Sequence, residues 1–265
     1  NNLKVHTQYS ICEGAIKIDD LANYCKINKI KAIGLADSYN LCGALEFSEK
    51  ISKVGTQPII GTQINFKLNK YISKIPIFAT SENGFKNLSK LSSKSYIEIE
   101  ALDEPHCKIE DLLELNEGII VLSGGVKDFF GGLYRLNKIN DLEKIISSIH
   151  EKFNDRFYLE IQRHNDEHEI DFENFLLKIS LKKKIPIIAS QEVYYINKDM
   201  AEAHDALTCI GNKNFISDKS RDKLSSEHYF KNSQDLFEIY KDIPEALENN
   251  YNFPYRFSYK LKKSN

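Results

Sequence analysis

At 265 residues, with 42% hydrophobic residues, the chain can bury one large core or two small ones. Lysine and arginine total 36 against 38 acidic residues, and the net charge of −2 excludes a strong overall attraction to nucleic acid. No run approaches the roughly 20 apolar residues of a membrane span, and the opening apolar segment is too short for a signal peptide. We therefore expect a cytoplasmic protein with no membrane contact.

The cysteines support the same expected location. They are odd in number and include no C-x-x-C pair, which favours reduced thiols over a disulfide framework or a zinc site. They are Cys12, Cys25, Cys42, Cys107 and Cys209.

Short β-branched runs alternate with longer amphipathic segments along most of the chain, which is typical of α/β folds with parallel strands. Several runs, such as Ile119–Leu122, are apolar throughout, as in strands buried on both faces. We predict seven strands, at Leu3–His6, Ala32–Ala36, Ile59–Phe66, Ile75–Ala79, Gly118–Leu122, Phe157–Ile161 and Pro186–Ala189.

Between these strands, apolar residues recur at helical spacing. Gly55 follows one such segment and is expected to end the helix there. The predicted helices are Asp19–Lys29, Ala44–Val54, Asn83–Lys94, Asp141–Phe153 and Asp171–Lys184, with a long loop over Ser95–Lys108.

After Ala189 the pattern changes. Asp242 and Glu245 have the spacing of a capping box, and Pro244 suits the first turn of a helix. This region holds too few apolar residues for a core of its own, so we expect an extension that packs on the preceding domain or leads into something further on. We predict helices at Ala201–Ile210 and Ser233–Tyr240, a third entered at Asp242–Glu245, and an irregular polar segment over Gly211–Glu227.

Polar side chains recur where predicted strands end. If the strands are parallel, their carboxyl ends meet at one mouth of a barrel, and these side chains converge there. The ligand-capable residues among them are few for a phosphoesterase that clamps phosphate between two or three ions. They are His6, Glu13, Asp37, His164 and Glu192. On this reasoning alone the function stays open.

Longer blocks of the sequence resemble a known family. They are Leu3–Ser10 with Glu13–Ala15, Gly34–Asp37 with Asn40–Phe47, Pro58–Gly61, Glu82–Leu88, Leu115–Gly118 with Leu122–Gly125, Phe157–His164, and Tyr229–Ser233 with Asp242–Leu247. In this order they resemble the start of bacterial replicative DNA polymerase III alpha subunits. The resemblance covers nearly the whole chain.

The resemblance implies the polymerase-and-histidinol-phosphatase (PHP) domain, an α/β fold that forms a distorted seven-stranded (β/α) barrel. We expect the barrel at residues 1–210. A helical extension at 211–265 would lead toward the polymerase palm, which is not in this chain.

The resemblance also implies that most metal ligands of the family are replaced. Metal-binding members carry H-x-H on the first strand, where this chain has Lys4 and His6. By this alignment only His6, Glu13 and Glu192 keep ligand-capable side chains, as a vestigial metal site; the replaced positions are Lys4, Ser38, Gln63, Lys74, Gly125 and Tyr194. Because a lysine ammonium repels divalent cations, we expect no cofactor in this domain. The alternative is Zn²⁺ or Mn²⁺ held weakly.

For the parent protein, the resemblance implies a DNA-directed DNA polymerase of replication that uses Mg²⁺ and meets DNA outside this domain. Its implied partners are the proofreading exonuclease subunit and other replicase subunits. We expect this fragment to be inactive, to stabilise the subunit and to dock the exonuclease. The alternative is a metal-dependent phosphoesterase or 3′–5′ exonuclease.

Docking would need an exposed apolar surface. One candidate is Phe129–Tyr134, which we predict to be a loop. The other is the set of tail aromatics, for which ordinary packing against helices is the favoured interpretation; these are Tyr251, Phe253, Tyr255 and Phe257.

Overall fold

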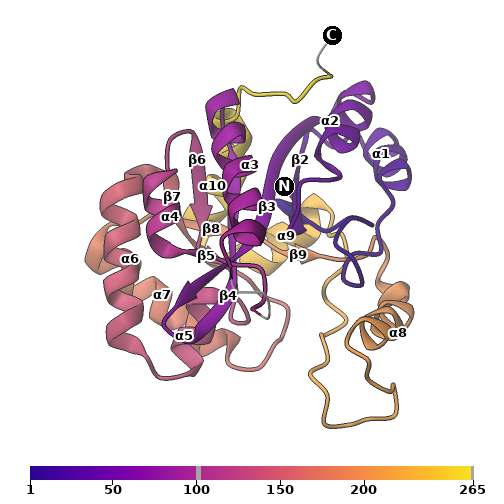
Figure 1. Cartoon of the computed structure of the whole chain (residues 1–265). Coiled ribbons are helices and arrows are strands. Elements are labelled where there is room, and N and C mark those ends of the chain that lie inside the picture. The colour runs from indigo at the N-terminus through magenta and orange to yellow at the C-terminus, as the bar shows by residue number, and fades with distance from the viewer. Residues whose placement is uncertain (100–102, 264–265) are drawn as a thin grey trace.

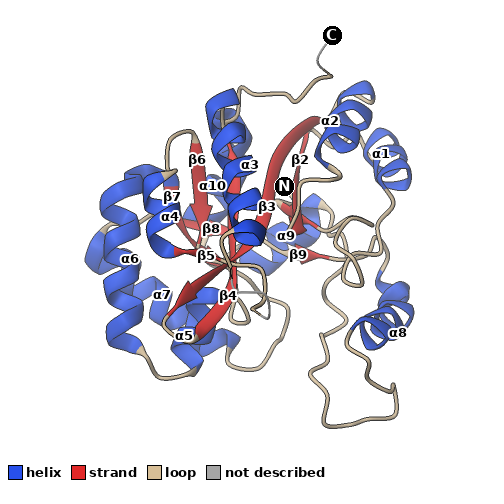
Figure 2. Cartoon of the chain, viewed as in Figure 1, coloured by secondary structure: helices blue, strands red, loops and turns tan. Residues whose placement is uncertain are grey.

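The apolar runs of the chain form one curled nine-stranded sheet that is flanked by helices (Figure 1, Figure 2). This computed structural model describes residues 1–99 and 103–263. The strands are β1 (Lys4–Val5), β2 (Ala32–Ser38), β3 (Gln57–Leu68), β4 (Tyr71–Ala79), β5 (Cys107–Lys108), β6 (Ile119–Leu122), β7 (Phe157–Ile161), β8 (Ile187–Ala189) and β9 (Glu192–Val193). All seven predicted strands are present, β5 and β9 are additional, and together they form the distorted barrel that was expected.

Helices flank the curled sheet, and α8 lies to one side, apart from the strands, as Figure 2 shows. They are α1 (Ile18–Ile27), α2 (Ala44–Lys53), α3 (Glu82–Ile97), α4 (Ile109–Glu114), α5 (Phe129–Arg135), α6 (Ile139–Phe153), α7 (Glu169–Lys183), α8 (Ala201–Gly211), α9 (Ser233–Tyr240) and α10 (Pro244–Asn252). No helix of the described residues is long and apolar enough to cross a bilayer.

The sheet runs in the order β8-β7-β6-β4-β3-β2-β1-β9, with β5 paired to β3. The expectation of parallel strands is wrong at β4, which is antiparallel to both β3 and β6. The physical reason is the connection from β3: a tight turn at Asn69, in the left-handed region with φ 55°, leaves no room for a crossover helix.

One extended stretch, residues 187–193, joins the two edges of the curled sheet. Its first part, β8, pairs with β7. Its last part, β9, pairs with β1 and sets Lys4 opposite Glu192. Gly34 allows β1 to lie close to β2, because a Cβ at this position would be 2.0 Å from the carbonyl oxygen of Leu3. The pairing of β9 with β1 thus brings the first and last strands of the chain together.

Helix α5 and strand β5 lie in segments that the sequence analysis predicted to be loops. Residues Phe129–Tyr134 belong to helix α5, and Phe129, Phe130 and Leu133 are fully buried in the main core. The docking loop predicted there is therefore wrong, because these side chains pack inward. The predicted loop over Ser95–Lys108 begins within α3 and ends in β5, and its residues 100–102 lie outside the described part.

Helix ends follow the predictions in part. Gly55 has φ +83° just beyond α2, as expected for a C-terminal cap. Pro244 stands in the first turn of α10, but the predicted capping box at Asp242 and Glu245 is absent, since the N-cap Ile243 makes no side-chain cap bond. A capping box forms one helix earlier instead, between Asn232 and Asp235 of α9.

The tail packs on the barrel, as expected. Phe253 and Phe257 belong to the cluster that fills the interior of the curled sheet. Phe253 lies 5.8 Å, between ring centroids, from both Phe78 and Tyr158. Tyr255, by contrast, is 78% exposed. The amino end of β3 is tied to the same segment, since Gln57 Nε2 donates to the carbonyl of Pro254 over 2.9 Å.

This packing yields a stability prediction. Phe253→Ala should lower the free energy of unfolding by about 3–5 kcal/mol, because it opens a cavity inside the barrel. Tyr255→Ala is the matched control and should change it by less than about 0.5 kcal/mol. Urea unfolding of both variants measures the difference. Equal effects would contradict the packing of the tail into the barrel.

Candidate functional site

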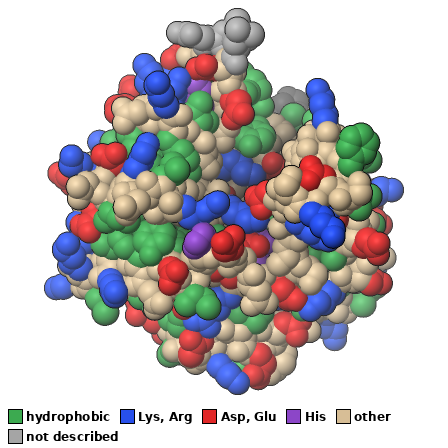
Figure 3. Space-filling view, turned by 90° about the horizontal axis from the view of Figure 1, so that it is seen from below, with side chains coloured by type: hydrophobic (Ala, Val, Ile, Leu, Met, Phe, Trp, Pro, Cys, Tyr) green, Lys and Arg blue, Asp and Glu red, His purple; other side chains and the backbone are tan. Residues whose placement is uncertain are grey.

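A cavity of about 290 Å³ lies where the carboxyl ends of several strands meet. The cavity is lined by side chains from β4 and β9, from the turns after β1, β6 and β7, and from α8 with the loop after it. Its charged and aromatic lining residues are Glu13, Lys74, Lys127, Asp128, Asp166, Glu192, Tyr194, His204, Asp222 and His228. Figure 3 shows lysine, histidine and carboxylate side chains around a hollow in the face seen from below.

At the base of this region the ammonium of Lys4 is surrounded by three carboxylates. Its Nζ lies 2.6 Å from Glu192 Oε2, 3.3 Å from Glu160 Oε1 and 3.4 Å from Asp128 Oδ2. The Lys4 side chain is 0% exposed. Four separate segments of the chain, β1, β7, β9 and the turn after β6, supply these groups.

Burial and charge act against each other in this group. Burial by itself would lower the pKa of Lys4, but Glu160, Glu192 and Asp128 outweigh it and hold that pKa above its usual value. Burial likewise opposes charge on Glu192, yet Lys4 and His6 hold its pKa well below the usual value. For Asp128 and Glu160 burial prevails and raises the pKa despite Lys4. The ion pair is therefore centred on Lys4 and Glu192.

The predicted ligand His6 is fully buried and already has protein partners. Its Nε2 contacts Glu192 Oε1, and its Nδ1 lies 3.0 Å from Ser10 Oγ. The ring stacks on Tyr194 with a centroid distance of 4.5 Å. Gln63 Nε2 donates to Glu192 Oε1. The structure therefore joins His6 and Glu192.

The third predicted ligand, Glu13, is engaged elsewhere. Ser38 Oγ donates to its carboxylate, and Lys74 Nζ lies 3.3 Å from its Oε1. Burial would raise the pKa of Glu13, but Lys74 and His6 hold it below the usual value. A side chain at Gly125 would not fit as the arrangement stands, because a Cβ there would lie 2.2 Å from Gln162 Oε1.

The candidate Asp37 serves the turn after β1. It accepts hydrogen bonds from Thr7 N over 2.6 Å, from Thr7 Oγ1 over 2.7 Å and from Ser10 Oγ over 2.7 Å. Burial raises its pKa, although the hydrogen bonds oppose this. Its two oxygens are therefore used to hold the strand end that carries His6.

Sequence reasoning missed two of the three carboxylates around Lys4. Glu160 stands on β7 two residues after Tyr158, which faces the barrel interior, so the period of two places Glu160 on the same face. A charged residue within an otherwise apolar strand was the sequence signal that could have identified Glu160. Asp128 follows the turn Ser123–Gly125, and its Oδ2 accepts from Gly125 N over 2.7 Å.

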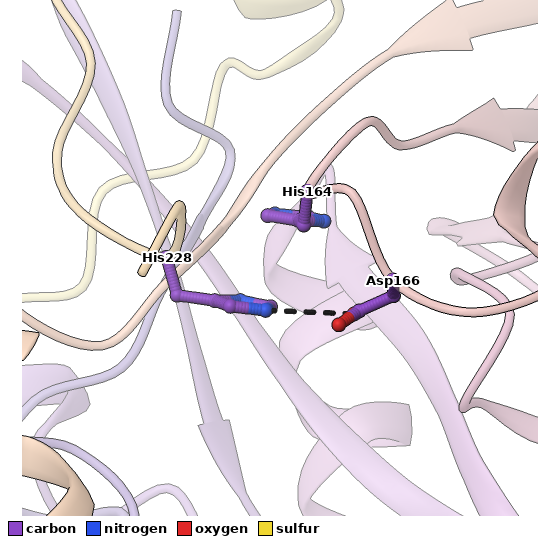
Figure 4. A group of neighbouring side chains, drawn as sticks. All are labelled: His164, Asp166 and His228. Atoms are coloured by element: carbon purple, nitrogen blue, oxygen red, sulfur yellow. Dashed lines mark ion pairs between the residues drawn. The ribbon is translucent and has the colours of Figure 1, made fainter. Parts of the chain in front are cut away.

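A second histidine group lies beside the cavity, formed by His164, Asp166 and His228 (Figure 4). One ligating atom from each lies within 4.8 Å of the others, so the group contains the donor types for a metal ion. The two imidazoles are stacked, with centroids 4.1 Å apart and planes 3° from parallel. His228 Nε2 lies 3.5 Å from Asp166 Oδ2.

This stacked arrangement does not aim its donors at one point. The lone pairs of parallel stacked rings lie in separate planes, whereas one ion needs a lone pair in the plane of each ring. His164 Nε2 also accepts a hydrogen bond from Glu192 N over 3.0 Å, which places the ring proton of the neutral form on Nδ1. Burial, and to a smaller extent the neighbouring His228, lowers the pKa of His164 well below its usual value. A metal would require an imidazole to rotate.

The loop after α8, residues 212–232, brings His228 to this position. Arg221 holds the loop to α8 through two contacts of 2.6 Å with the carboxylate of Asp205. Lys127 Nζ lies 3.1 Å from Asp222 Oδ1 across the cavity rim. The loop therefore forms one wall of the cavity.

Comparisons with known proteins identify the family of the chain. The PHP domain family matches residues 2–164, more than half of the chain. The chain belongs to this family.

Its relatives include DNA polymerase III alpha subunits. The subunit of Caulobacter vibrioides is 33% identical over 270 residues, which cover 99% of this chain and 24% of that protein. The subunit of Borreliella burgdorferi is 34% identical over 260 residues, which cover 94% of this chain and 23% of that protein. The chain therefore spans about a quarter of the length of these relatives. The resemblance predicted from the sequence is confirmed.

Two solved structures are similar at much lower identity. An amidohydrolase from Chromobacterium violaceum, with bound sulfate and no metal, is 9% identical with a TM-score of 0.49, over 73% of this chain and 87% of that one. A two-domain protein from Bacteroides vulgatus, containing a predicted PHP-like metal-dependent phosphoesterase, is 12% identical with a TM-score of 0.44, over 73% of this chain and 51% of that one.

The site also yields a prediction about pH. Glu169 accepts hydrogen bonds from the backbone of His164 and Asn165, and burial raises its pKa from 4.5 to about 7. The folded state therefore binds more protons than the unfolded state between these values, and the free energy of unfolding should fall as pH rises through them. The loss is on the order of 3 kcal/mol at most.

Glu169→Gln keeps an acceptor oxygen but cannot titrate, so its stability should fall less between pH 5 and pH 7 than that of the wild type. Urea unfolding at the two pH values measures this difference. The exposed neighbour Glu167→Gln is the control and should follow the wild type. Equal pH dependence in all three proteins would show that Glu169 does not titrate in this range.

Proposed function

We propose that this chain is a non-catalytic PHP domain of a replicative DNA polymerase III alpha subunit. In this proposal the parent polymerase is cytoplasmic, copies DNA with Mg²⁺ and contacts DNA outside this domain. The barrel spans residues 1–210, and the extension at 211–265 leads toward the palm. The length of the relatives, about four times that of this chain, supports a domain within a larger subunit.

One observation carries the non-catalytic assignment: the ammonium of Lys4 stands among carboxylates where a metal ion would need them. A second cation at this position would be repelled at close range in a medium of low dielectric constant. The vestigial ligands support the same conclusion, since His6 and Glu192 contact each other and Glu13 is paired with Lys74. We therefore propose that His6, Glu13 and Glu192 hold the barrel mouth together and do not ligate a catalytic metal.

Purified chain should contain no stoichiometric metal and should show no nuclease or phosphoesterase activity in added Zn²⁺ or Mn²⁺. Elemental analysis and a hydrolysis assay on single-stranded DNA test both points. Stoichiometric metal together with an activity that His6→Ala abolishes would overturn the assignment and favour the alternative, a metal-dependent phosphoesterase or 3′–5′ exonuclease. The stacked group of His164, Asp166 and His228 is the feature that keeps this alternative worth testing.

The second part of the proposal is that the domain docks the proofreading exonuclease, with the other replicase subunits assembled on the parent protein. Two exposed apolar groups suit such docking. The tail tyrosines Tyr251 and Tyr255 are 68% and 78% exposed. On the loop after α8, Phe215 and Ile216 are 80% and 62% exposed.

Docking is tested by co-purification of the full-length polypeptide with the exonuclease subunit. Two double variants are compared: Tyr251→Ala with Tyr255→Ala, and Phe215→Ala with Ile216→Ala. One of them should weaken binding by tenfold or more. Leu181→Ala is the control, because Leu181 is equally exposed on α7 and lies in neither group. No binding by the wild-type polypeptide would end the docking proposal, and undiminished binding by both variants would exclude these two surfaces.

A further inference from the structure

We propose that a second cavity, at the amino-terminal end of the barrel, binds a free nucleotide, with its phosphate groups on lysine side chains and its base on exposed aromatic rings. The cavity has a volume of about 650 Å³. It lies where β1, β2 and β3 begin, at the end of these strands opposite the barrel mouth, and α9 and α10 complete its wall. The inference goes beyond the proposed function and does not depend on it.

The lining of this cavity is basic, although the chain carries a net charge of −2. None of the described residues that line it is acidic, and three are lysines, Lys29, Lys31 and Lys231. The ammonium of Lys231 is engaged, since it donates to the carbonyl of Glu227 over 2.6 Å and lies 3.6 Å from the ring centroid of Tyr229. Lys29 and Lys31 are exposed and form no ion pair with any described residue. Two ammonium groups are therefore available to an anion.

Aromatic rings stand beside these lysines in the same wall. Phe237, Tyr251 and Tyr255 line the cavity and are 52%, 68% and 78% exposed. The rings of Tyr251 and Tyr255 have centroids 6.5 Å apart and planes inclined by 64°. Two faces of different orientation are thus offered to a flat ligand. Stacking on such faces suits any nucleobase, because every base has a π-face.

One acceptor in the wall lacks a hydrogen-bond donor. Asn2 lines the cavity and is 4% exposed. Its Nδ2 donates to the carbonyl of Lys231 over 2.8 Å, which fixes the orientation of the amide. Its Oδ1 has no donor among the described residues. A buried acceptor without a donor is costly, and an amino group such as that of adenine would satisfy it.

Size and chemistry favour a nucleotide over a protein segment. The volume falls within the range of roughly 300–1,000 Å³ that is typical of small-molecule sites. Lysine binds phosphate as a point charge, whereas carboxylates are bound in pairs of hydrogen bonds by arginine. No described residue of the lining is an arginine. Lysines next to exposed rings therefore match a base that carries phosphate groups.

Calorimetric titration of the whole chain with ATP tests the proposal. EDTA is present throughout, so that no metal ion at the barrel mouth contributes to the signal. About one ATP should bind per chain. Adenosine and inorganic triphosphate should each bind more weakly than ATP, because each supplies only part of the contacts. Absence of ATP binding would overturn the inference.

The phosphate contacts are tested by Lys29→Gly combined with Lys31→Gln, which should weaken ATP binding by tenfold or more. Residue 29 has φ 53°, which glycine adopts without strain, so this variant should melt no lower than the wild type. Lys90→Gln with Lys178→Gln removes the same charge from exposed positions on α3 and α7 and should bind like the wild type. Equal losses in both variants would show a general effect of net charge and contradict the site.

The base contacts are tested by Tyr251→Leu combined with Tyr255→Leu. Leucine keeps an apolar side chain but removes the aromatic face. This variant should weaken ATP binding by about fivefold or more and leave the binding of inorganic triphosphate unchanged. Unchanged ATP binding would show that the site takes phosphate alone, which overturns the assignment of a nucleotide.

Single-stranded DNA and an acidic peptide are the competing ligands. If an oligothymidylate or a polyglutamate peptide binds more tightly than ATP, and the lysine variant loses that binding, the cavity serves a macromolecule and the inference fails. Because Tyr251 and Tyr255 also belong to one candidate docking surface, the titrations contain no exonuclease subunit. Failure of ATP binding removes only the nucleotide site and leaves the non-catalytic assignment and the docking proposal standing.

Discussion

The buried ammonium of Lys4 is the interaction on which the rest of the barrel mouth depends. Its three carboxylate neighbours come from distant parts of the chain, so the contact joins β1 to β7, β9 and the turn after β6. Removing one partner of such a buried group leaves an uncompensated charge and typically costs about 3–5 kcal/mol. Further contacts from His6 and Gln63 converge on Glu192, the carboxylate closest to the ammonium.

The closure of the sheet creates this contact. Residues 187–193 pair with β7 at one end and with β1 at the other, so the strand that completes the barrel also delivers Glu192 to Lys4 and His6. The same geometry brings His6 into contact with Glu192, whereas Glu13 is paired with Lys74. A PHP barrel can thus keep its mouth intact through ion pairs and hydrogen bonds among its own side chains.

Particular residues show how far sequence reasoning reached. The apolar run Ile119–Leu122 was recognised as a strand because continuous burial leaves a plain pattern. The helix Phe129–Arg135 contradicts the predicted exposed loop, because two adjacent glycines within seven residues hide its periodicity. Glu160 passed unnoticed, since one carboxylate in a strand shows no partner until the strand is placed opposite Lys4. His228 was not considered, because the loop that carries it has no periodic pattern that would place it beside His164.

By itself, the sequence determined the alternation of strands and helices, the family, and the presence of Lys4 two residues before His6 on the first strand. These properties are local, since they depend on which residue follows which. Tertiary structure alone decided which carboxylates surround the ammonium and which tail aromatics fill the barrel. These depend on contacts between residues that lie more than a hundred positions apart, such as Lys4 with Asp128, and no local pattern encodes such contacts.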